Sequence, residues 1–176
     1  MTLVKLSKTK FGINLGFLSI DSEWEIDETQ KNASWEMYVE LITRISTAPL
    51  EPGEGLLREA LSSLYSLFGT TREILRKYGP PIATPGNPDD ITFGHLAVAI
   101  LNKVLRPVLA KWHPQLKDWE DHRPKDLSVT AHEAAWPQNE ALRSEINKIR
   151  GRLMEYANVL AEVSGVAKLT DYPSES

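Results

Sequence analysis

A chain of 176 residues forms one domain, and a domain of this size buries roughly 70% of its unfolded surface without needing a disulfide. The absence of cysteine excludes disulfides, thiolate metal sites and cysteine nucleophiles, and it is typical of a reducing compartment. A formal net charge of −4 and a pI near 5.6 argue against binding to nucleic acid through overall charge.

The N-terminal segment predicts a small β-ribbon. From Leu18 to Ile26 apolar and polar residues alternate with the period of two that is typical of a half-buried strand. Val4 and Leu6 are its expected partners, joined to it through residues 12–16. We therefore expect an extended ribbon over residues 1–26.

After residue 26 the apolar residues take helical spacing, which predicts an all-α fold. The expected architecture is an antiparallel bundle of four long helices with the N-terminal ribbon beside it. The helices are predicted over residues 28–47, 57–78, 92–112 and 137–165. The bundle then spans 27–165 within a single domain of residues 1–169, and a disordered tail is expected over 170–176.

Capping residues and prolines set the expected ends of these helices. Asp27 with Gln30, and Thr130 with Glu133, have the spacing of capping boxes. Pro107 removes a backbone donor and is expected to bend the third helix near residue 103. The His113-Pro114 pair is expected to end that helix, with an irregular connection over residues 114–129.

The third predicted helix carries the most informative pattern of the chain. It is apolar on most sides, but four polar residues project within about 20° of one direction at about 100° per residue. They are His95, Asn102, Arg106 and His113. Such a stripe is either a thin edge that faces water or a site, and the sequence leaves both open.

Part of the stripe resembles a known family. The segment from Arg106 to His113 is similar to the signature of HEPN-type ribonucleases, in which an arginine precedes a histidine by several residues. The resemblance covers eight residues, and Pro107 departs from the polar residue that usually follows the arginine. It implies a helical dimer in which His113 is the acid or base, Arg106 stabilises the phosphate, and Asn102 orients either. Such an enzyme needs no metal.

Tryptophan is abundant between residues 112 and 136, and these side chains have two interpretations. Trp112, Trp119 and Trp136 all stand beside or near turns. Aromatic residues there plug the end of a bundle, which is the favoured alternative, or they form a partner-binding patch because tryptophan is enriched at interface hot spots.

No cofactor motif is present, and we expect neither a cofactor nor a metal site. The histidines and acids between His113 and His132 lack the spacing of metal ligands on one helix face. The N-terminus has no apolar core typical of a signal peptide. The most apolar stretch, Phe93 to Leu109, is interrupted by Lys103, Arg106 and Pro107, so we expect a cytoplasmic protein without a membrane span.

These patterns favour a non-enzymatic interaction or regulatory protein as the primary hypothesis. It would be a bacterial cytosolic accessory or effector-associated module that forms a homodimer or docks on a larger protein partner. The alternative is a HEPN-like ribonuclease, a toxin or defence effector with Arg106 and His113 at a dimer interface, and only then is nucleic acid a partner. A third hypothesis is a small-ligand sensor with a cavity around Asn102 and Arg106.

Overall fold

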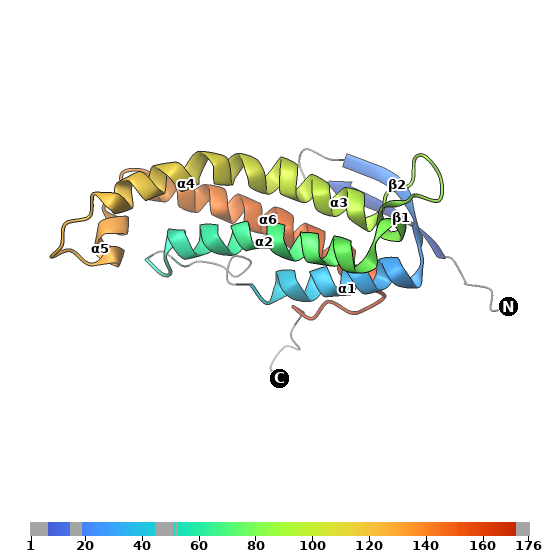
Figure 1. Cartoon of the computed structure of the whole chain (residues 1–176). Helices are drawn as coiled ribbons and strands as arrows, with labels where there is room; N and C mark the ends of the chain where they lie inside the picture. Colours follow the sequence, from blue (N-terminus) through green and yellow to red (C-terminus); the bar gives the residue numbers. More distant parts are fainter. Residues whose placement is uncertain (1–6, 15–18, 45–50, 52, 172–176) are drawn as a thin grey trace, which may run out of the picture.

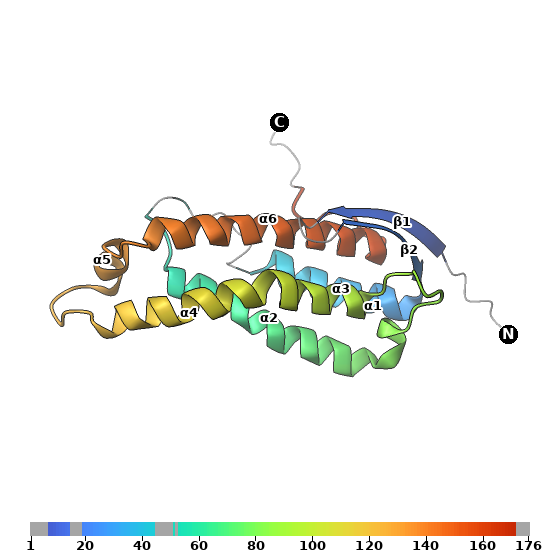
Figure 2. The same ribbon diagram turned by 90° about the horizontal axis from the view of Figure 1, so that it is seen from above.

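A computed structural model describes residues 7–14, 19–44, 51 and 53–171, and the chain is mostly helical (Figure 1). The all-α class predicted from the sequence is therefore confirmed. The long helices and their connections lie side by side along the length of the molecule, and α2 contacts α1 and α4 (Figure 2). The α-helices are α1 (Glu28–Ile42), α2 (Leu57–Tyr78), α3 (Phe93–Ala99), α4 (Arg106–Asp121), α5 (Val129–Ala134) and α6 (Asn139–Ser164).

The two strands pair as an antiparallel ribbon near one end of the helices (Figure 1). Strand β1 (Ser7–Asn14) runs against β2 (Ser19–Ile26), so the strand predicted from alternation is present. The partner segment differs from the expectation, because Gly12 lies inside β1 opposite Asp21 instead of in the turn. The expected partners at positions 4 and 6 lie outside the described residues.

The start of α1 ties the ribbon to the helices. The Asp27 side chain accepts a hydrogen bond from the Gln30 backbone N–H at 2.7 Å, which confirms the predicted N-cap. The Gln30 side chain does not complete a capping box. It is buried, and its Oε1 accepts from Trp24 Nε1 at 3.3 Å and from the Phe93 backbone N–H at 3.0 Å. One amide therefore joins β2, α1 and α3.

Helix α1 ends earlier than predicted, at Ile42, and Thr43 is its C-cap residue. The Thr43 hydroxyl donates to the Val39 carbonyl at 2.7 Å and so satisfies one of the free carbonyls of the last turn. Positions 45–47 of the predicted helix lie outside the described residues.

A π-helical segment, η3 (Ile100–Leu105), joins α3 to α4 in one continuous helix. Here the Arg106 N–H bonds the Leu101 carbonyl, five residues back instead of four. Pro107 follows at once, and its ring conflicts with the carbonyl four residues before it. The disturbance expected near residue 103 is therefore a local widening of the helix.

The predicted end at His113-Pro114 is wrong, because α4 continues through Pro114 to Asp121. The predicted irregular segment is accordingly helical over residues 114–121. Pro114 is exposed, so water can reach the carbonyl that loses its partner, while Leu116 on the next turn is fully buried. Burial of the last turns outweighs the cost of the proline.

The capping box predicted at Thr130 is also wrong. Ser128 caps α5, with its Oγ accepting from the Ala131 N–H at 3.1 Å. Glu133 is buried and serves another helix: its carboxylate accepts from the Leu57 N–H at 2.8 Å and from the Arg58 N–H at 3.4 Å. Helix α2 has no side-chain cap of its own, so Glu133 satisfies its first donors.

Helix α6 follows the predicted heptad and ends at Gly165 in the left-handed conformation, with φ of 71°. Its predicted apolar positions are buried: Leu142, Ile146, Ile149, Leu153, Tyr156, Leu160 and Val163. Burial raises the pKa of the Tyr156 hydroxyl far above its usual range. Beyond α6 the Leu169 N–H bonds the Tyr38 hydroxyl at 2.7 Å, and the last five positions of the expected tail lie outside the described residues.

The continuous helix Phe93–Asp121 is long and apolar enough to cross a membrane, the one such helix among the described residues. Half of its most apolar window is buried against the rest of the chain. A core helix of a helical domain has the same properties, so this helix by itself is weak evidence for a membrane span.

Candidate functional site

The structure brings two of the four stripe residues, Arg106 and His113, into one groove between α2 and α4. The groove has a volume of about 370 Å³, within the range of roughly 300–1,000 Å³ that is usual for small binding sites. We call it the aromatic groove. It is lined by Tyr65, Phe68, Arg72, Arg106, Leu109, Ala110 and His113.

The other two stripe residues do not line this groove. His95 is exposed in the first turn of α3, where its Nδ1 lies 3.0 Å from the Thr92 hydroxyl. Asn102 is exposed in the π-helical segment and accepts a bond from Arg106 Nε at 3.0 Å. The common direction was predicted for a regular α-helix, and the wider segment between His95 and Arg106 breaks that regularity.

One end of the aromatic groove is basic. The Arg106 guanidinium lies 5.4 Å from the centre of the Phe68 ring, and Arg72 Nε donates to the Phe68 carbonyl at 3.1 Å. Each arginine thus uses its Nε on a residue four positions earlier in its own helix. Among the described residues neither guanidinium has a carboxylate partner, so the terminal nitrogens of both are available for an outside anion.

The middle of the groove is aromatic. The Tyr65 ring lies 6.1 Å from Phe68 and 5.9 Å from the His113 ring, which it meets edge-on. Tyr65 is 61% exposed, the largest exposure among the large apolar and aromatic residues that the structure describes. An exposed ring between charged groups is a surface that gains contact area when a partner binds.

His113 closes the other end of the groove, and it is neutral. Arg58 Nη1 lies 2.7 Å from His113 Nδ1, and because a guanidinium only donates, Nδ1 is the acceptor and the remaining proton is on Nε2. Burial, and after it the Arg58 charge, hold the His113 pKa below its usual value, against the smaller effect of Glu120. The Nε2 atom is buried and has no hydrogen-bond partner among the described residues.

Arg58 is itself held by Glu120. Its Nε and Nη2 lie 2.9 Å from Oε1 and Oε2 of that carboxylate, a bidentate pair between α2 and α4. The charge of Arg58 is therefore neutralised, unlike the charges of Arg72 and Arg106. The positive field of the groove comes from its other end.

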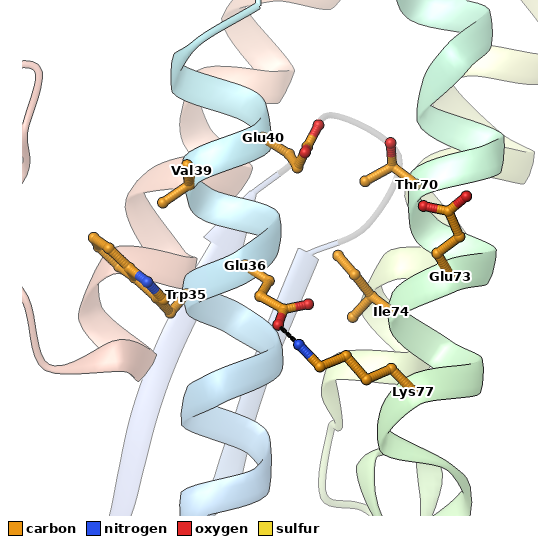
Figure 3. Close-up of a pocket in the computed structure, with 8 residues that line it drawn as sticks. All are labelled: Trp35, Glu36, Val39, Glu40, Thr70, Glu73, Ile74 and Lys77. Carbon is orange, nitrogen blue, oxygen red and sulfur yellow. Dashed lines mark hydrogen bonds and ion pairs between the residues drawn. The ribbon is translucent and has the colours of Figure 1, made fainter.

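A second cavity, of about 470 Å³, lies on the opposite flank of α2, against α1. Figure 3 shows that the Lys77 ammonium reaches across it to the Glu36 carboxylate. We call it the bridged groove. It is lined by Trp35, Glu36, Val39, Glu40, Thr70, Glu73, Ile74 and Lys77.

Most polar groups of the bridged groove are paired with each other. Glu36 also accepts from the Tyr78 hydroxyl at 2.9 Å, and the hydrogen bond to Glu36 raises the Lys77 pKa. Arg44 bonds Glu40 at 2.7 Å and Thr70 at 2.8 Å. These interactions tie α1 to α2, so the cavity is a braced seam between two helices.

The predicted tryptophan patch is placed mostly in the core. Trp112 and Trp136 are buried and meet edge-on with ring centres 6.0 Å apart. Trp119 is half-buried, stacks on His132 at 4.7 Å and donates its Nε1 proton to the His132 carbonyl at 2.8 Å. This arrangement agrees with the plug at the end of the bundle, the alternative that the sequence favoured.

Sequence reasoning missed the α2 wall of the site. Tyr65, Phe68 and Arg72 stand at positions i, i+3 and i+7, so they share one face of the helix. Phe68 was expected in the apolar stripe of α2, and it is indeed partly buried. The available signal was a charged residue and an exposed-type aromatic at the edge of that stripe.

Among the described residues no group of three or more histidine, aspartate or glutamate side chains is placed to hold a metal ion. Comparison with known proteins gives no match to a family model, a curated protein or a solved structure. The resemblance to HEPN ribonucleases therefore rests on the segment from Arg106 to His113 alone.

Proposed function

We propose that this protein is a non-enzymatic interaction module, built on an antiparallel bundle of four long helices, that self-associates or docks on a protein partner through the aromatic groove. The observation that carries this proposal is the exposed Tyr65 ring beside two arginines without carboxylate partners. Tyrosine and arginine are the residues most enriched at interface hot spots, together with tryptophan. The lack of cysteine supports a reducing, cytosolic setting, as in a bacterial accessory or effector-associated protein.

The state of His113 supports binding over catalysis. A general base needs a nitrogen that can accept a proton from substrate, but Nδ1 already accepts from Arg58 and Nε2 is enclosed. Arginine does not exchange protons near neutral pH. The groove therefore offers charge and apolar contact, and no group in this arrangement is free to transfer a proton.

The interaction is tested by the oligomeric state of the purified protein. Sedimentation velocity over a range of concentrations should show a reversible dimer that Tyr65→Ser weakens by about tenfold, a typical loss for a hot-spot residue. Val129→Ser is the matched control, because Val129 is also exposed (45%) but lies on α5, outside the groove. A protein that is monomeric at every concentration removes self-association and leaves docking on a different protein.

A HEPN-like ribonuclease is the second candidate, since Arg106 and His113 do line the same groove. For it to act, Arg58 must release His113, and a second chain must complete the site. The test is cleavage of a mixed RNA pool without added metal, with Arg106→Ala and His113→Ala in parallel. Cleavage that both substitutions abolish at unchanged melting temperature would establish this candidate and overturn the first.

A further inference from the structure

The polarity of the aromatic groove defines the chemistry of what binds there. No carboxylate lines it, and Glu120, beyond His113, is already bound by Arg58. Arg72 and Arg106 therefore give one end an uncompensated positive charge, although the chain as a whole is acidic. A local field of this kind selects a negatively charged partner.

The geometry of the two arginines favours planar anions. Both guanidinium groups are anchored at Phe68, one on its ring and the other on its carbonyl. Because Nε of each is already bonded, rotation is restricted and the terminal nitrogens are presented as a pair of donors. Such forks match carboxylates in two-point contacts, which a flexible ammonium does not reproduce.

The rest of the groove is apolar and aromatic. Leu109 and Ala110 form its floor on α4, and the exposed Tyr65 ring forms the α2 side. A ligand that fills the groove must therefore have an apolar part next to its negative groups. An acidic peptide segment with an aliphatic or aromatic side chain meets both requirements, and arginine clusters commonly recognise acidic motifs in this way.

We propose that the aromatic groove is a docking site for an acidic peptide segment of a protein partner. Carboxylates of that segment pair with Arg72 and Arg106, and a neighbouring apolar side chain packs against Tyr65 and Leu109. This inference rests on the proposed function, because it takes the groove to be the interaction surface and adds the chemical nature of the partner.

The test is selection of binding peptides from a random 12-residue library displayed on phage, with the full-length protein as target. Enriched peptides are expected to carry aspartate or glutamate together with an apolar residue. The double variant R72Q/R106Q should lose this enrichment, and R72E/R106E should enrich lysine and arginine instead. Arg76→Gln is the matched control, an exposed arginine one turn further along α2 and outside the groove.

Affinities of the selected peptides then decide the inference. By fluorescence anisotropy, R72Q and R106Q should each weaken binding by about tenfold, while R76Q leaves it unchanged and all variants keep the melting temperature of the parent. Enrichment of neutral or basic peptides, or no enrichment at all, overturns the proposal. Displacement of the peptides by adenosine monophosphate at a concentration similar to their own Kd also overturns it, because the site would then be selective for phosphate.

The two proposals fail in different measurements. If Tyr65→Ser dissociates an assembly but no acidic peptide is selected, the inference is wrong and the interaction function stands. If acidic peptides are selected with the expected dependence on Arg72 and Arg106 while the protein stays monomeric, docking on another protein is the function. If neither result is obtained, both proposals are wrong.

Discussion

The two flanks of α2 have similar cavities and opposite treatment of charge. In the bridged groove Glu36 meets Lys77, and Glu40 meets Arg44, so carboxylates and cations face each other across the α1–α2 seam. In the aromatic groove Arg72 and Arg106 face no carboxylate, and Tyr65 stands open to solvent. The difference teaches that cavity size is a poor guide to a binding site, and that charge left without an internal partner is a better one.

The largest effect is expected from loosening the wall that both grooves share. Glu133→Ala removes the cap of α2 and leaves two N–H groups without their partner, so the free energy of unfolding should fall by about 2 kcal/mol. Urea denaturation measures this. Glu59→Ala, an exposed acid in the same first turn, is the control and should have a small effect. An equal loss in both variants would contradict the capping role.

A second substitution separates the grooves by function. Arg106→Glu reverses one of the unpaired charges and should weaken self-association or partner docking at least about tenfold, with little change in melting temperature. Glu73→Lys, a reversal at an exposed position of the bridged groove, should leave the association unchanged. Sedimentation velocity of both variants compares them. A larger effect of Glu73→Lys would assign the interaction to the wrong flank.

Acid should affect the aromatic flank first. Since the folded protein lowers the His113 pKa, the unfolded chain binds the proton more readily, and stability is lost as the pH falls below the ordinary histidine pKa of about 6.5. The melting temperature of the parent should therefore fall more between about pH 7 and pH 5 than that of His113→Gln, which keeps an acceptor for Arg58 and does not titrate. Lys77 on the other flank has a raised pKa and stays charged throughout. Identical pH profiles would show that His113 is not the responsible group.

The smallest effect is expected from the exposed bridge. Lys77→Gln removes the ion pair with Glu36, but the lysine is solvated and the Tyr78 hydroxyl still donates to that carboxylate. The urea midpoint should remain that of the parent within error. A clear loss of stability would show that the seam depends on this pair, and the contrast between the two flanks would have to be restated.

Local signals predicted most of the helical framework. The Gly79-Pro80 stop and the heptad ending at Gly165 gave the ends of α2 and α6, because glycine and apolar spacing act within a few residues. Pro114 and Glu133 were misjudged for the opposite reason. Whether a proline is tolerated depends on burial of the turns beyond it, and Glu133 caps a helix that begins 76 residues earlier in the chain.

The candidate site was predicted by half. Arg106 and His113 were visible as polar residues on an apolar helix, and the structure places both in the aromatic groove. Tyr65 and Arg72 were not, since only the packing of α2 against α4 brings them to the same cavity. Arg58 was missed as well, although it determines the protonation of His113.

The π-helical segment Ile100–Leu105 also constrains how the length of this chain can vary in evolution. It contains one residue more than a regular α-helix would need over the same distance. Deletion of a single residue there would restore the α-helix but rotate all that follows by about 100°, which carries Arg106 away from α2 and Trp112 out of the core. We expect natural relatives to vary in length in the connection between η2 (Pro80–Ala83) and α3, and to conserve the residue count from Phe93 to Asp121.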